Sequence, residues 1–181
     1  MEDTLQSQIL PFFSPPYTND NNHAIDWGYN GLIAYASGAC INLSYQINNK
    51  LQHVGSIEVN PFQISCVKFH PNLPIIAIGD VKGRVFLWDI NNSQFLASAK
   101  PLKKGADKCL SLQWHENVLL VLLNTRKLIA VSYIKGSNTD ILRNLKILWE
   151  LAPPNDYTKI SIDPYFQTNF LLSGNSSFII Y

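Results

Sequence analysis

Short runs of apolar or alternating residues recur along most of the chain, and Gly, Asn, Asp and Pro divide them. Such runs predict strands at 24–27, 32–36, 40–45, 51–59, 64–69, 75–78, 84–90, 94–99, 109–114, 118–123, 127–134, 147–151, 159–162, 170–172 and 178–181. No window of about eleven residues shows the apolar spacing of a helix. Many short strands with turn signals are typical of an all-β sandwich, barrel or propeller.

A repeat in the pattern distinguishes these three architectures. Four segments share one plan, in which a strand ends in an aromatic or aliphatic residue and a turn leads to a very apolar strand. They read AIDWGYNGLIAYA, CVKFHPNLPIIAIG, LSLQWHENVLLVLL and KISIDPYFQTNFLLS, and they align at Trp27, Phe69, Trp114 and Ile162. The steps of 42, 45 and 48 residues are close to the WD-repeat period of about 40–45 residues, with four strands per propeller blade.

The second unit contains a Trp-Asp pair in the expected place. Asp80 to Gly83 is predicted to form a tight turn in which Gly83 has a positive φ. The next strand ends in Trp88 and Asp89, so the Trp can pack between blades while the Asp closes the following turn. Ile78 and Lys82 stand where a WD-repeat blade often has Ser and Asp. We therefore expect apolar packing, rather than that polar network, to hold these blades.

The repeat also divides the chain into regions. Residues 1–22 are predicted to form a flexible tail, and residues 23–181 a WD-repeat β-propeller region. Its blades are expected at about 23–60, 61–102, 107–152 and, in part, 156–181. Seven blades need roughly 290 residues, so we expect an incomplete seven-blade propeller with three and a half to four blades present. The alternatives are a four-blade propeller, with residues 5–13 as its missing outer strand, and a short product closed by a partner chain.

Composition narrows the class of partners. Hydrophobic residues make up 46% of the chain, charged residues 15%, and the formal net charge is +1. This charge offers no long-range electrostatic field that would attract nucleic acid.

The longest apolar run, 118–123, is too short to cross a membrane, and the N-terminus lacks a signal-peptide pattern, so we expect a cytoplasmic protein. The separated residues Cys40, Cys66 and Cys109 are expected to be reduced, buried thiols.

The sequence contains no motif for catalysis, cofactor binding or metal binding. The chain lacks a Gly-rich phosphate loop, a Gly-x-Ser-x-Gly elbow and a His-Glu-x-x-His pair, which indicates that it is not an enzyme. The four histidines, His23, His53, His70 and His115, are expected to be solvent-facing turn residues. Four aspartates flank predicted strand ends and are expected to cap turns; they are Asp26, Asp80, Asp89 and Asp163.

One basic cluster occupies the predicted loop between the second and third blades. It consists of Lys100, Lys103, Lys104 and Lys108. A solvated loop is the simplest interpretation. The functional alternative is a docking loop for an acidic peptide or a lipid headgroup, which would give a peripheral association with membranes.

Several strings resemble one family of WD-repeat proteins. Residues 24–35, with Asp26-Trp27-Gly28 followed by Gly31, are similar to the opening of the first blade in the WD repeat-containing protein 11 family. The turn and strand at 80–89, the Leu-Trp-Glu string at 148–150, and the turn containing Asp163 and Pro164 also resemble that family. The Asp26-Trp27-Gly28 string is the specific part, whereas the other strings would fit many WD-repeat proteins.

This resemblance implies a large cytoplasmic scaffold of two propellers, with no catalytic residues. The family takes part in a complex that captures endosome-derived vesicles at the trans-Golgi network, and a nuclear pool is also described for it. An alternative is an adaptor subunit of a chromatin or ubiquitin-ligase complex. A propeller enzyme would need carboxylates or histidines on its inner strands, and the predicted inner strands 64–69 and 109–114 contain none.

Overall fold

The structure is a computed structural model that describes residues 23–28, 31–48, 50–59, 62–99, 107–132, 145–163, 165, 169–175 and 177–181. The predicted tail at 1–22, which includes the strand candidate at 5–13, lies outside the described residues. All regular elements of the described residues are strands, which confirms the all-β prediction. No helix in this part of the chain is long and apolar enough to cross a membrane.

Each predicted strand is present, with bounds within two residues of the prediction. The first sheet contains β1 (Ile25–Trp27), β2 (Leu32–Ser37), β3 (Cys40–Ile47) and β4 (Lys50–Glu58), and the second β5 (Ile64–Phe69), β6 (Ile75–Asp80), β7 (Val85–Asp89) and β8 (Gln94–Ala99). The third contains β9 (Cys109–His115), β10 (Val118–Leu123), β11 (Lys127–Ser132) and β12 (Lys146–Leu151), and the fourth β13 (Lys159–Ile162), β14 (Phe170–Ser173) and β15 (Phe178–Ile180).

The strands of each sheet lie in chain order, and every neighbouring pair is antiparallel. Tight turns make this order possible. Between β2 and β3, Gly38 has a φ of 59°, and between β6 and β7, Gly83 has a φ of 71°. Glycine reaches this left-handed region without the steric cost of a side chain. Each sheet is therefore a meander of hairpins.

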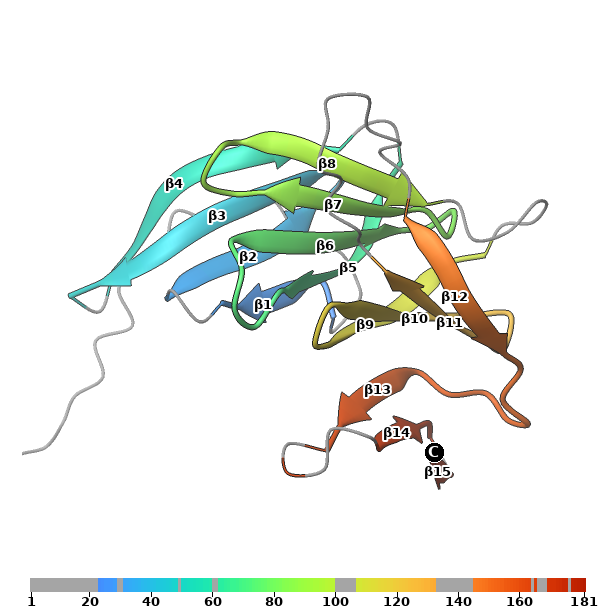
Figure 1. Ribbon diagram of the computed structural model, residues 1–181. Coiled ribbons are helices and arrows are strands. Elements are labelled where there is room, and N and C mark those ends of the chain that lie inside the picture. The colour runs from blue at the N-terminus through green and yellow to red at the C-terminus, as the bar shows by residue number, and fades with distance from the viewer. Residues whose placement is uncertain are drawn as a thin grey trace, which may run out of the picture.

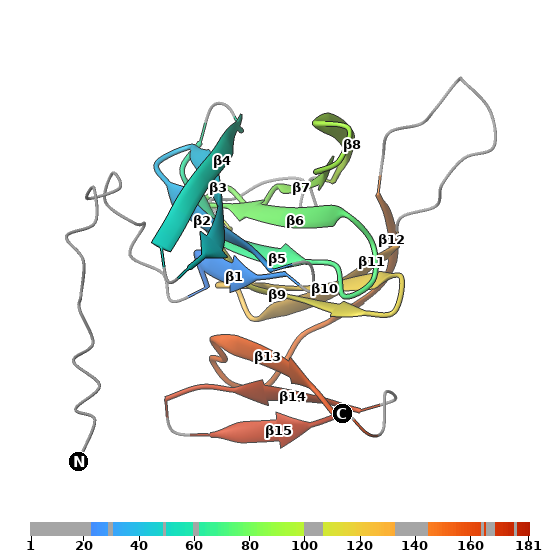
Figure 2. The ribbon, with the colours of Figure 1, turned by 90° about the vertical axis from the view of Figure 1, so that its left-hand side faces the viewer.

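The sheets pack face to face in sequence order, and three apolar clusters fill the spaces between them. One cluster combines buried side chains of the first and second sheets, the next those of the second and third, and the last those of the third and fourth. Strand β5 contacts both β1 and β9, and β9 contacts β13. The first strands of the sheets thus lie innermost, and the sheets radiate from them as propeller blades (Figure 1, Figure 2).

The outermost strand of each four-stranded sheet carries a β-bulge. The extra residues are Val54 in β4, Leu96 in β8 and Leu148 in β12. A bulge bends its strand and increases its twist. The same bend in three successive sheets is structural evidence that they are copies of one unit.

Candidate protein-interaction site

The Asp26-Trp27-Gly28 string forms the end of β1 and the start of the first turn. Gly28 N donates to the Leu32 carbonyl at 2.8 Å, and Gly31 N donates to the Gly28 carbonyl at 3.0 Å. Gly31 has a φ of 78°, which suits glycine. The turn fixes the end of β1, where Trp27 is 61% exposed. A large aromatic side chain therefore stands exposed at the end of β1.

Asp26 joins the first blade to the second. Its Oδ1 accepts a hydrogen bond from Lys68 Nζ at 2.7 Å, and its Oδ2 accepts one from Phe69 N at 2.8 Å. The side chains of Lys68 and Asp26 are 32% and 14% exposed. The expectation that Asp26 caps a turn is therefore wrong, because its carboxylate holds the neighbouring inner strand.

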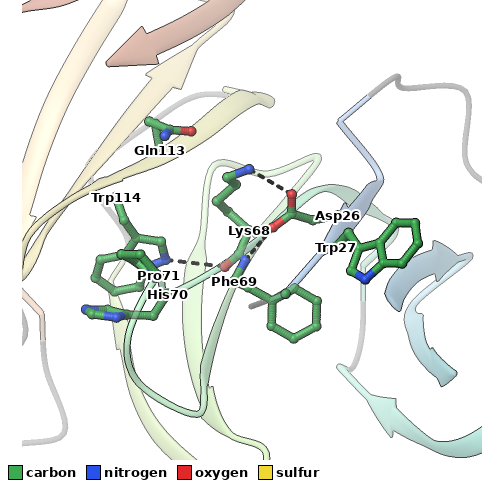
Figure 3. Close-up of a pocket in the computed structure, with 9 residues that line it drawn as sticks. Asp26, Trp27, Lys68, Phe69, His70, Pro71, Gln113 and Trp114 are labelled. Carbon is green, nitrogen blue, oxygen red and sulfur yellow. Dashed lines mark hydrogen bonds and ion pairs between the residues drawn. The ribbon is translucent and has the colours of Figure 1, made fainter. Parts of the chain in front are cut away.

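A pocket of about 340 Å³ lies where the inner strands of the first three blades end. It is lined by Asp26, Trp27, Gly28, Lys68, Phe69, His70, Pro71, Gln113 and Trp114. Figure 3 shows the Lys68–Asp26 pair between Trp27, from the first blade, and Trp114, from the third. Three blades contribute to one surface, so the pocket exists only when they are packed in order.

The far wall of the pocket is held by His70 and Trp114. Trp114 Nε1 donates to the Lys68 carbonyl at 3.3 Å, and the two rings have centroids 4.7 Å apart. His70 Nδ1 accepts hydrogen bonds from Asn72 N and Leu73 N, both at 3.1 Å. Burial lowers the pKa of His70 below its usual value. His70 is therefore a neutral, structural member of the wall.

The prediction that all four histidines face solvent is wrong for His70, which is only 3% exposed. Of the other three histidines, His53 is exposed, and His23 and His115 are half-buried. Burial, followed by the positive charges of Lys159 and Lys68, lowers the pKa of His23. Among the described residues, no three His, Cys, Asp or Glu side chains come together in a way that could hold a metal ion.

The second-blade motif stabilises its own turn. The Asp80 carboxylate is fully buried and accepts hydrogen bonds from Lys82 N at 2.8 Å, Arg84 N at 2.9 Å and Arg84 Nε at 2.6 Å. Gly83 N donates to the Asp80 carbonyl. A Cβ at Gly83 would collide with the Asp107 carbonyl oxygen of the next blade. The turn-capping prediction is confirmed for Asp80, and glycine is needed beside it.

The remaining motif residues are also structural. Trp88 packs against the core between the first and second sheets. Asp89 accepts hydrogen bonds from the backbone and side-chain nitrogens of Asn92, at 3.1 and 2.9 Å. Asp163 accepts one from Tyr165 N at 2.8 Å, whereas Pro164 lies outside the described residues. Asp89 and Asp163 thus cap turns, as predicted.

The predicted docking loop falls only in part within the described residues. Lys100, Lys103 and Lys104 lie outside the described residues. Lys108 is half-buried, and its backbone is tied to Asn124 by hydrogen bonds of 2.9 and 3.0 Å. The docking role of this loop stays a prediction.

Two cysteines that are far apart in sequence meet between the second and third blades. Cys66 and Cys109 are fully buried free thiols. Gly79 makes room for them, because a Cβ there would lie 2.7 Å from both Cys66 Sγ and Cys109 Cβ. A hydrogen bond with Cys66, together with burial, raises the pKa of Cys109. Cys40 is only partly buried, so the expectation of a buried thiol is wrong at that position.

Comparisons with known proteins support the fold. No protein-family model and no curated protein matches the chain. Among solved structures, it is similar to a WD40 propeller in "Crystal Structure of Mitotic Checkpoint Complex", with a TM-score of 0.69 and 12% sequence identity. The match covers 91% of this chain and 49% of that chain, so this chain spans about half the length of the structure it matches. The four sheets therefore have the fold of β-propeller blades.

Proposed function

We propose that the chain belongs to a non-enzymatic WD-repeat scaffold that binds other proteins during vesicle tethering between endosomes and the trans-Golgi network. The observation that carries the binding role is the pocket shared by three blades, whose walls include the side chains of Trp27 and Trp114. Exposed aromatic side chains on rigid elements are favourable anchors for protein partners because they bury a large area with little loss of side-chain entropy.

The polar groups of the pocket support binding rather than catalysis. Asp26 is engaged with Lys68 and the Phe69 amide, and His70 accepts two backbone hydrogen bonds. A general acid or base needs a titratable group that can reach a substrate. In this pocket both candidates already hold the blades together.

The trafficking role rests on the resemblance of residues 24–35 to the WD repeat-containing protein 11 family. The same resemblance supports a cytoplasmic location at the trans-Golgi network or on vesicles, with a nuclear pool, and partners from a vesicle-tethering complex. A peripheral association with membranes through the loop at 100–108 belongs to the same proposal.

Proximity labelling of the full-length protein in cells tests this proposal. We expect the labelled set to be enriched in Golgi and endosomal tethering proteins. The same labelling enzyme, expressed without the scaffold, is the control. Recovery of chromatin or ubiquitin-ligase subunits without such tethers would contradict the trafficking role and favour an adaptor function of the same fold.

A further inference from the structure

Cys66 and Cys109 lie beside each other at the interface between the second and third blades. Both side chains are 0% exposed. Both sulfur atoms lie within 3.1 Å of one point, the position that a Cβ of Gly79 would occupy. The two cysteines are 43 residues apart, on β5 and β9, which contact each other as the innermost strands of their blades. A bond between the sulfurs would therefore join two blades covalently.

A β-bulge lies beside each of these cysteines. The pairing of β5 with β6 shifts between Ile64 and Cys66, and the pairing of β9 with β10 shifts between Ser111 and Cys109. The inner strands of the first and fourth sheets pair with their neighbours without a shift. A bulge redirects the side chains beside it and interrupts the ladder of hydrogen bonds. Of the four inner strands that the structure describes, only the two that carry these cysteines are irregular, and both are irregular at the cysteine.

The closed interface keeps Cys109 in its neutral form. A hydrogen bond with Cys66, followed by burial, raises the pKa of Cys109, and a thiol reacts far more slowly than a thiolate. Oxidation therefore needs a local opening between the two blades, of the kind that native proteins undergo below their global unfolding. The bulges reduce the ladder of hydrogen bonds at the place where this opening has to occur.

We propose that Cys66 and Cys109 form a redox-sensitive lock between the second and third blades, which a hydroperoxide closes and a dithiol opens. The lock is the Cys66–Cys109 disulfide. The inference goes beyond the proposed function, because it concerns the joint between two blades, whatever the scaffold binds.

The closing reaction has two steps, written here for hydrogen peroxide. One cysteine sulfur, after losing its proton, attacks a peroxide oxygen; the O–O bond breaks, and a sulfenic acid and water form. The second cysteine sulfur then attacks the sulfenic sulfur; the S–O bond breaks, the S–S bond forms, and the leaving hydroxide takes up the thiol proton as water. Two electrons pass from the two thiols to one peroxide. A dithiol returns the two thiols by disulfide exchange and is itself oxidised.

Peptide mapping of the full-length native protein tests the pairing. The reduced protein is treated with hydrogen peroxide, remaining thiols are alkylated, and mass spectrometry quantifies the linked peptides. The Cys66–Cys109 link should exceed the two links that contain Cys40 at least about tenfold, because a disulfide needs its two Cβ atoms close together. Dithiothreitol should reverse the link. The same treatment in concentrated urea is the control, and there the preference should be lost.

Hydrogen exchange tests whether the link acts as a lock. Amides of β5 and β9 should exchange at least about tenfold more slowly in the oxidised protein than in the reduced protein, because the disulfide opposes local opening of the interface. Cys40→Ser keeps both members of the pair and should show the same difference. Cys66→Ala removes one member, so peroxide should leave its exchange unchanged. The comparison of oxidised with reduced wild-type protein stands even if Cys66→Ala fails to fold.

Three results would overturn this inference. The first is a native protein in which links to Cys40 are as abundant as the Cys66–Cys109 link. The second is the absence of that link at a peroxide exposure that oxidises Cys40. The third is a link that forms but leaves exchange in β5 and β9 unchanged. None of these results bears on the labelling experiment, so the lock and the scaffold role can fail separately.

Discussion

The second and fourth blades share one sequence plan, yet the burial of their strands differs sharply. All six residues of β6 in the second blade are buried, because one face packs on the first sheet and the other on the third. In the fourth blade only one face is covered, so Ile179 packs inward while Ile180 is 63% exposed. An apolar strand becomes core only where a neighbouring blade covers it.

The first blade shows the same asymmetry and places it at the candidate site. Leu32, Ala34 and Ala36 of β2 face the second sheet and are buried, whereas Ile25 and Trp27 of β1 are exposed. The exposure of Trp27 is thus a property of its position in the stack.

Replacing an isoleucine by alanine should change the free energy of unfolding far more in the second blade than in the fourth. Ile78→Ala in the second blade opens a cavity in a closed core and should lower the free energy of unfolding by about 3 kcal/mol. Ile180→Ala in the fourth blade should change it by less than about 0.5 kcal/mol. Urea denaturation of both variants measures the difference. Similar losses would mean that the two blades are equally enclosed.

Adding a methyl group tests the closeness of the second and third blades. Gly79→Ala should destabilise the protein by about 1–3 kcal/mol, because the new Cβ would lie 2.7 Å from Cys66 Sγ and Cys109 Cβ. Gly55→Ala is the matched control, since a Cβ there meets no atom within 4 Å. A stable Gly79→Ala protein in thermal denaturation would show that these blades are packed more loosely than described.

The Asp26–Lys68 ion pair between the first and second blades should contribute less to the free energy of unfolding. A double-mutant cycle with Asp26→Asn and Lys68→Met should give a coupling energy of about 0.5–1 kcal/mol, reduced by the partial exposure of both side chains. The exposed Arg126–Asp156 pair is the control and should couple more weakly. No coupling between Asp26 and Lys68 would remove their role in joining the blades.

Lowering the pH should have the smallest of these effects on the free energy of unfolding. The pKa of His70 in the folded protein lies below its usual 6.5, so the unfolded chain binds a proton first as the pH falls through that value. The free energy of unfolding should therefore decrease from pH 7.5 to pH 5.5. His70→Gln should reduce this slope. A slope unchanged by His70→Gln would contradict a buried neutral imidazole.

The sequence was sufficient for the strands and the repeat, because alternation and turn residues are local signals. It could not show which blades meet at a given residue. Asp26 and Lys68 are 42 residues apart, and nothing in either local string reveals the ion pair. His70 resembled a turn histidine because its backbone does lie in a turn, but Trp114 of the next blade covers it. The pocket is a tertiary feature for the same reason.

The four blades are packed in order, and the two middle blades are enclosed on both faces. Amide hydrogen exchange measures this most directly, because protection follows local burial and hydrogen bonding. We expect the slowest exchange in β6 and β10 and the fastest strand amides in β1 and β15. Equal protection across all four sheets, or slower exchange in β15 than in β6, would contradict the stack described here.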